Sequence, residues 1–256
     1  MIGAHGLRPS PLDSARFGIV VERIACDGDV DLTGLLQAIQ RSSADLIILR
    51  TDAGQSEVAT ALQQQGEFVI HADTLVYYGM PLQPLMGHTA SNVRAATETD
   101  RHAIAMIAKA GFHGYRSHYS ANPLLPQQWV EEGYVEWAQS RLADADYASA
   151  TWVVTDGDDI AGFATCDRHG DMIDIVLNAV HPAFERRGHY GALLGHLIRH
   201  YGNLALQRLV ISTQIWNYGV QRQWTKAGLR LYSAMDTYHI DRRLIGRSGS
   251  TSTRVL

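Results

Sequence analysis

The chain has 256 residues, enough for one large or two small domains with a sizeable apolar core. Its 26 acidic residues outnumber the 22 basic ones, and a formal net charge of -4 offers no basic surface for nucleic acid. No apolar run reaches membrane-spanning length, and the first residues lack the pattern of a signal peptide. We therefore expect a cytoplasmic protein that binds neither nucleic acid nor a membrane.

The two cysteines, Cys26 and Cys166, are too far apart in sequence to form a metal-binding pair. Neither has neighbours that indicate an activated thiol. We expect two buried structural thiols and no bound metal.

Apolar periodicity predicts alternating strands and helices in the first part of the chain, which indicates a small α/β domain. The predicted strands are 17–24, 46–49 and 68–78, and the predicted helices are 32–40 and 57–64. Prolines and a glycine in residues 81–91 break this pattern and predict a linker, so residues 1–90 are expected to form the N-terminal α/β domain.

The second part has a different order, with two helices followed by a three-strand meander. A helix capped by Asp100 and ended by Gly111 is expected first, because acidic N-caps and glycine C-caps are common. The later predicted elements are a helix at 129–142, strands at 149–155, 160–167, 171–180, 208–215 and 231–240, and helices at 193–201 and 217–227. Residues 91–245 form the second predicted domain, and 246–256 a flexible tail.

The turn between the strand at 171–180 and the next helix carries a possible phosphate site. Arg186, Arg187, Gly188 and Gly191 lie where a helix begins, and its first N–H groups have no intrahelical partner. Glycine permits close approach of a diphosphate, and arginine adds charge-assisted hydrogen bonds. An ordinary turn with solvated arginines is the alternative interpretation.

This order of elements resembles the GCN5-related N-acetyltransferase (GNAT) family over residues 92–240. Val180-His181-Pro182 and Gly188 are similar to the family's pyrophosphate loop, although Glu185 and Tyr190 depart from it. The resemblance implies an α/β (α+β) fold with a mixed, mostly antiparallel sheet flanked by helices, and acyl-CoA as co-substrate. The implied coenzyme-binding residues are Leu177, Val180, Arg186, Arg187, Gly188, His189, Tyr190, Gly191, Asn217 and Trp224.

A second motif, Asn217-x-x-Val220 followed by Trp224-x-x-x-Gly228, is similar to the family's Asn-x-x-Ala-x-x-x-Tyr-x-x-x-Gly. In that resemblance Asn217 binds the pantetheine or phosphate arm. Trp224 stands where many members have the tyrosine that protonates the departing thiolate. An indole donates a hydrogen bond but no proton at neutral pH, so another donor or water is needed.

A finer resemblance, to the TDP-fucosamine acetyltransferase group of nucleotide-sugar N-acyltransferases, rests on residues 112–140 and on Ser212-Thr213-Gln214. It implies that Arg116 clamps the phosphates of the acceptor, that Tyr119 packs against its sugar or base, and that Gln214 contacts it. A buried ion pair is the alternative for Arg116.

Acyl transfer to an amine requires donors for the developing oxyanion, and free N–H groups at residues 177–180 are expected to supply them. The catalytic candidates are His118 as base, Asn178 to orient the amine, and Tyr218 as one possible proton donor. Each has a structural alternative, and Tyr232, Tyr238, His239 or a water chain can also move the proton.

The sequence thus predicts an N-acyltransferase that moves an acyl group from acyl-CoA to the amino group of a dTDP-linked amino-deoxy sugar in a ternary complex. The alternatives are another small amine or a peptide N-terminus as acceptor, or a non-catalytic acyl-CoA-binding module. An exposed edge strand near the C-terminus is expected to permit a homodimer.

Overall fold

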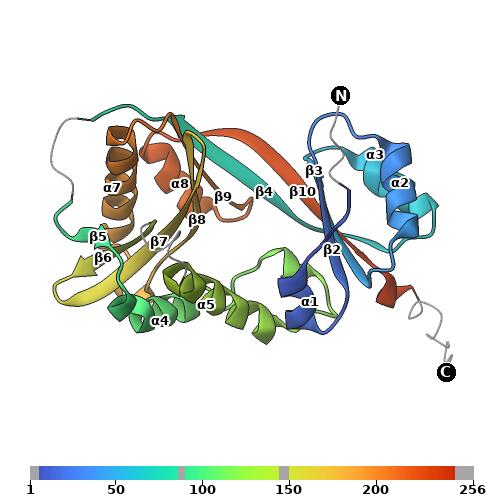
Figure 1. The fold of residues 1–256 in the computed structure, drawn as a ribbon, viewed down its shortest axis with the longest axis horizontal. Helices are drawn as coiled ribbons and strands as arrows, with labels where there is room; N and C mark the ends of the chain where they lie inside the picture. The colour runs from blue at the N-terminus through green and yellow to red at the C-terminus, as the bar shows by residue number, and fades with distance from the viewer. Residues whose placement is uncertain (1–5, 86–89, 144–149, 246–256) are drawn as a thin grey trace, which may run out of the picture. The chain divides into compact units, whose positions relative to one another are not determined.

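A computed structural model describes residues 6–85, 90–143 and 150–245 (Figure 1). The described chain divides into two compact units. Unit 1 contains the described residues up to Leu75, together with Arg116–Trp129 and 234–245. Unit 2 contains the described residues of Val76–Tyr115 and Val130–Ser233.

Unit 1 contains a mixed sheet with helices on both faces. Strand β2 pairs with β3 in parallel, and β3 pairs with β10 antiparallel. Its elements are β1 (Arg8–Pro9), α1 (Pro11–Phe17), β2 (Val21–Cys26), α2 (Leu32–Arg41), β3 (Leu46–Asp52), α3 (Ser56–Gln64), η2 (His118–Ala121) and η4 (Arg242–Leu244), together with parts of β4 (Val69–Pro81) and β10 (Arg230–Asp241).

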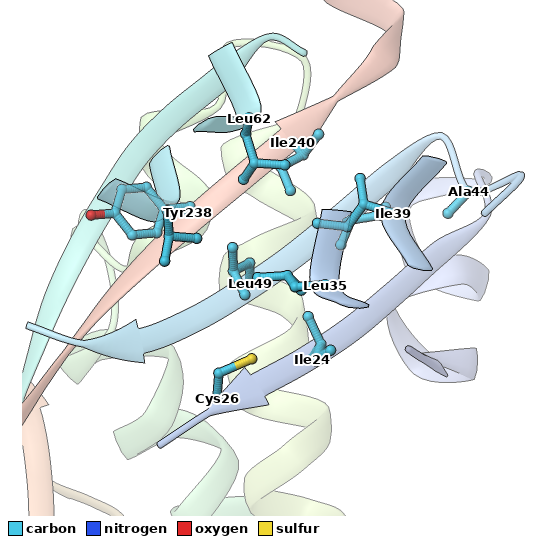
Figure 2. Close-up of a cluster of buried hydrophobic side chains, with 11 residues drawn as sticks. Ile24, Cys26, Leu35, Ile39, Ala44, Leu49, Leu62, Tyr238 and Ile240 are labelled. Carbon is cyan, nitrogen blue, oxygen red and sulfur yellow. The ribbon is translucent and has the colours of Figure 1, made fainter. Parts of the chain in front are cut away.

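The core of unit 1 is an apolar cluster between this sheet and helices α2 and α3 (Figure 2). Alternate strand residues point to one face of a sheet, which is why Ile24, Leu49 and Ile240 meet on the helix side. The strand residues between these apolar ones point to the opposite face of the sheet. Helix α2 is capped by Asp31, whose carboxylate accepts a hydrogen bond from the Gly34 N–H at 3.0 Å.

Unit 2 contains a larger sheet in the order β4-β9-β8-β7-β6-β5. The pairs β5–β6, β6–β7 and β7–β8 are antiparallel, and β8–β9 is parallel. Its other elements are β5 (Val93–Ala95), η1 (Glu98–Asp100), α4 (Arg101–Gly111), α5 (Gln127–Ala143, which begins in unit 1), β6 (Thr151–Asp156), β7 (Asp159–His169), β8 (Met172–Val180), η3 (Pro182–Phe184), α7 (His189–Asn203), β9 (Arg208–Gln214) and α8 (Tyr218–Lys226).

The predicted α/β class with a mixed sheet flanked by helices is confirmed, and most predicted elements have a counterpart within a few residues. Cys26 and Cys166 are both buried, as expected. The predicted strand at 17–24 is wrong at its start. Phe17 ends α1, and Gly18 closes that helix with a left-handed backbone, so the strand begins only at Val21.

The expected cap at Asp100 also differs from the structure. Its carboxylate accepts a hydrogen bond from the Thr97 N–H at 2.7 Å and pairs with Arg94. Asp100 therefore closes a capping box that starts η1, and makes no side-chain cap to α4.

The expectation of an edge strand near the C-terminus is wrong. Strand β10 lies between β3 and β4 in the sheet order, while β1 and β5 are the outer strands. The C-terminal strand therefore gives no support for a homodimer.

The predicted tail at 246–256 and part of the predicted linker, residues 86–89, lie outside the described residues. The linear domain boundary near residue 90 stays a prediction, and compactness divides the described chain differently. None of the described helices combines the length and apolar character needed to cross a membrane.

Asp174 provides a test of the packing in unit 2. It lies on β8 where this strand pairs with β9, and burial raises the pKa of its carboxyl to about 6. The folded state therefore favours the protonated acid, and stability is lost as pH rises from about 4 through 6.

We expect Asp174→Asn to raise the free energy of unfolding at pH 7.5 by up to about 3 kcal/mol, and to change little at pH 4. Urea denaturation at both pH values measures this difference. The control is Asp171→Asn, since Asp171 is exposed. Equal effects of Asp174→Asn at the two pH values would contradict the buried-carboxyl interpretation.

Candidate active site

The central feature of unit 2 is the point where two parallel strands separate. The β8–β9 ladder contains four pairs, from Met172 opposite Arg208 to Ile175 opposite Ile211. Beyond it, β8 continues to Val180 and β9 to Gln214. A register shift in the β7–β8 ladder leaves one extra β8 residue just after Ile175, and bulges bend the strand that carries them. Beyond Ile175 and Ile211 the two strands are no longer paired with each other, and we call the region between their ends the slot.

The residues at the end of β8 alternate between two environments. Leu177 and Ala179 are buried in the apolar cluster that contains Ile104 and Phe163, whereas Asn178 and Val180 are half-buried on the other face. Leu177 thus contributes its backbone at the slot while its side chain packs in the core.

The turn after β8 is shaped to receive an anion. Arg186 and Gly188 have left-handed backbones, with φ of 63° and 87°. In helix α7, Ala192 donates to the Gly188 carbonyl at 3.0 Å, so the N–H groups before Ala192 are those without an intrahelical acceptor. A Cβ atom built on Gly188 or Gly191 would meet no atom within 4 Å. A helix start with free N–H groups and glycines is the kind of backbone at which proteins bind phosphate groups.

The two arginines of this turn differ in their surroundings. The Arg187 guanidinium donates to Asp156 at 2.8 Å and lies over the Phe184 ring. This hydrogen bond holds the pKa of the Asp156 carboxyl below its ordinary value. His189 Nε2 lies 3.3 Å from the same carboxylate. Arg186 is exposed beside them, so it is the arginine better placed to meet a phosphate.

Both departures from the expected motifs meet in one hydrogen bond. Trp224 Nε1 donates to the Tyr190 hydroxyl at 2.6 Å, which joins helix α8 to the first turn of α7. Trp224 is buried and also packs edge-on against Tyr78. Since an indole nitrogen only donates, the Tyr190 oxygen is the acceptor and its own hydrogen stays available. Burial raises the pKa of Tyr190, so the hydroxyl stays protonated at neutral pH.

The end of β9 lies beside an aromatic group. Tyr115 contacts the side chains of Gln214 and Thr213 through its hydroxyl, and its ring packs against Trp216. Asn217 Nδ2 donates to Thr213 Oγ1 at 3.1 Å. These contacts hold the side-chain amides of Gln214 and Asn217 at the end of β9. Tyr115 and Thr213 were missed as site residues, although the Ser-Thr-Gln run had marked this strand end.

The remaining predicted residues have distinct positions. Tyr218 starts α8 with 63% of its surface exposed. His118, Tyr119 and Arg116 belong to unit 1. His118 is buried, and its Nδ1 lies 2.8 Å from His239 Nε2, while Arg116 is exposed.

The Tyr119 hydroxyl contacts Arg23 and donates to Asp13 at 2.7 Å. Burial raises its pKa to about 12. The roles of His118, Tyr119 and Arg116 in the reaction stay predictions, and the contacts of His118 and Tyr119 give these two side chains a structural role in unit 1.

No group of three or more His, Cys, Asp or Glu side chains that could hold a metal ion occurs in the described part of the chain. The described chemistry of this region is that of backbone amides, aromatic hydroxyls and two exposed arginines, of which Arg187 is paired with Asp156.

Two parallel strands that stop pairing before their ends, followed by a glycine-containing helix start, are the two features that the family resemblance had led us to expect. Residues 115–229 match the family model described as the acetyltransferase (GNAT) family. This match, which covers 115 of the 256 residues, and the GNAT fold support an acyl-CoA-dependent N-acyltransferase. The alternative of a non-catalytic binding module is set aside.

Solved structures agree with this fold. A GCN5-related N-acetyltransferase from Sphaerobacter thermophilus is 16% identical, with a TM-score of 0.56 over 85% of this chain and 72% of that one. A putative GNAT acetyltransferase from Novosphingobium aromaticivorans is 16% identical, with a TM-score of 0.52 over 82% and 80%. A GCN5-related N-acetyltransferase from Kribbella flavida is 10% identical, with a TM-score of 0.53 over 88% and 84%. A search of curated proteins gives no match.

The hydrogen bond between Trp224 and Tyr190 can be tested by its removal. Tyr190→Phe leaves a buried indole N–H without an acceptor, so we expect it to lower the free energy of unfolding by about 1–3 kcal/mol. Urea denaturation measures the loss. The matched control is Tyr218→Phe, which removes an exposed hydroxyl and should change stability by less than about 0.5 kcal/mol. Similar values for the two variants would show that the bond is not formed in solution.

Proposed function

We propose that this enzyme transfers an acyl group from acyl-CoA to the amine of a dTDP-linked amino-deoxy sugar, by direct attack while both substrates are bound. The observation that carries the acyl-transfer part is the separation of β8 and β9 directly before an open anion seat. The sugar acceptor rests on the resemblance of residues 112–140, and the structural neighbours do not test it.

In this proposal the turn at residues 186–191 holds the coenzyme pyrophosphate, chiefly through backbone amides and Arg186. Asn217 and the Tyr190 hydroxyl would bind the pantetheine arm, and the hydrogen bond from Trp224 would orient that hydroxyl. The bound coenzyme supplies the acyl group as a thioester. The free N–H groups at the end of β8 orient its carbonyl and stabilise the developing oxyanion, each by about 3 kcal/mol.

The chemical step needs a neutral amine. Its nitrogen forms a bond to the thioester carbon, the carbon–sulfur bond breaks, and one amine proton passes to a base or to water. Asn178, near the end of β8, would orient the amine. His118 is the candidate base of this proposal, since its imidazole is neutral at working pH; burial and nearby positive charges lower its pKa well below the ordinary value, which also weakens it as a base.

The role of His118 has a direct test. If it is the base, His118→Ala should lower kcat by at least about 100-fold and remove the acidic limb of the rate–pH profile. A folded variant with an unchanged profile would exclude it. His71→Ala serves as the control, since His71 is a half-exposed histidine of the same unit.

The acceptor can be identified by a thiol-release assay with acetyl-CoA and longer acyl-CoAs. The panel contains several dTDP-amino sugars, simple amines and peptides with free N-termini. We expect turnover with one dTDP-amino sugar. Turnover with other amines alone would keep the acyltransferase and exclude the sugar.

The phosphate seat is tested separately by coenzyme binding. Gly188→Trp fills the open space over the turn, so we expect coenzyme A to bind at least about 100-fold more weakly, a loss of about 2.7 kcal/mol in calorimetry. Gly170→Trp is the matched control, because Gly170 also has a left-handed backbone and no atom near its Cβ position. Unchanged affinity of Gly188→Trp would exclude the seat.

A further inference from the structure

The polar face of the unit 1 sheet carries a second feature, separate from the slot in unit 2. It is the face opposite the apolar cluster of Figure 2. Directly paired residues of neighbouring strands point to the same side, and Thr237 pairs with Arg50 while Ile48 pairs with both Arg23 and His239. The polar residues that share this face are Arg23, Arg50, Thr237, His239 and Asp241.

Two of these charges have close partners. The Arg23 Nε donates to Asp13 at 2.7 Å. Asp241 accepts from Asn122 at 2.8 Å and pairs with Arg243 at 2.6 Å. Their burial is therefore compensated by opposite charges and hydrogen bonds.

Arg50 has no such compensation. It is half-buried, its Nε is inaccessible to solvent, and no described residue accepts a hydrogen bond from that atom. The buried Ser117 Oγ, Thr237 Oγ1 and His239 Nδ1 also lack a hydrogen-bond partner among the described residues. Thr237 and His239 are fully buried, and Ser117 is 4% exposed.

These groups lie in one neighbourhood. Arg50 and Thr237 are Cα partners on adjacent strands, and His239 follows two residues later on the same face. Ser117 precedes His118, whose ring contacts His239 at 2.8 Å. Burial lowers the pKa of both histidines, and the Arg50 charge lowers each of them further. The imidazoles are therefore neutral beside an arginine for which the described residues provide no counterion.

We infer that Arg50, Thr237, His239 and Ser117 form a binding site for an oxoanion, a carboxylate or phosphate group. A guanidinium presents several N–H donors in a plane that matches such groups. The hydroxyls of Ser117 and Thr237 add donors without charge, and the neutral His239 ring can present an N–H. A water molecule can satisfy the hydroxyls, but it leaves the arginine charge unbalanced.

The test is thermal unfolding of the full chain against rising sodium phosphate or sodium acetate, with sodium chloride holding ionic strength constant. We expect a saturable rise in Tm with at least one of the two anions, since a ligand that binds only the folded state stabilises it. The anion that acts at the lower concentration identifies the group. A rise that is absent, or that chloride reproduces, would overturn the site and leave bound water as its occupant.

Variants assign the effect to these residues. Arg50→Gln should raise the apparent Kd at least about tenfold, because it removes the charge. Arg41→Gln is the control, since Arg41 is an exposed arginine on α2 of the same unit, and it should keep the wild-type response. Thr237→Val removes one hydrogen-bond donor with little change of shape and should weaken anion binding severalfold. This variant tests the site if Arg50→Gln does not fold. Equal responses of wild type and both site variants would overturn the assignment.

A measurement in anion-free buffer distinguishes a ligand site from a structural arginine. Without a counterion the partly buried charge opposes folding. Arg50→Met should therefore keep or raise the Tm. A fall of several degrees would show that Arg50 supports the fold through its charge, contrary to the inference. None of these outcomes depends on acyl transfer, so failure of the proposed function and failure of this site are distinguishable.

Discussion

The separation of β8 from β9 after four residue pairs is the constraint on which the active region depends. Backbone N–H and C=O groups in a covered position need partners, and beyond Ile175 and Ile211 the two strands no longer supply them to each other. Helix α7 follows β8 and helix α8 follows β9. The starts of α7 and α8 therefore follow the two strand ends that have separated. In the proposed function, the coenzyme arm lies between these strand ends.

The hydrogen bond from Trp224 to Tyr190 joins those two helices. Each residue taken alone departs from the family motif, and each departure weakened the match at the sequence level. Together they form one buried contact, because the tyrosine hydroxyl at the start of α7 accepts from the indole of α8. The buried indole N–H of Trp224 therefore has its acceptor in the Tyr190 hydroxyl, which gives both residues a structural role.

The sequence predicted most helices and strands because their apolar residues recur at the period of the element. It did not predict where β8 and β9 separate. Strand β8 stays largely apolar past the last pair, and the change in β9 from apolar residues to Ser212-Thr213-Gln214 after Ile211 does not by itself indicate the end of a ladder. The strand predicted at 17–24 failed since Phe17 is apolar in either state, and only the left-handed Gly18 ends α1 there. The same limit applies to the site: His118 was chosen for its chemistry, and its contact with His239, 121 residues away, is not visible in a local pattern.

Strand β10 shows how a correct pattern can still suggest the wrong environment. Thr237, His239 and Asp241 alternate with apolar residues, which usually indicates a solvated face. All three are instead fully buried. A buried polar face is stable only when its groups find partners. Asn122 and Arg243 serve Asp241, and His118 serves one nitrogen of His239. Around Arg50, by contrast, buried polar atoms have no hydrogen-bond partner among the described residues, and the arginine has no counterion among them. An anionic ligand would supply both, which is why we infer one.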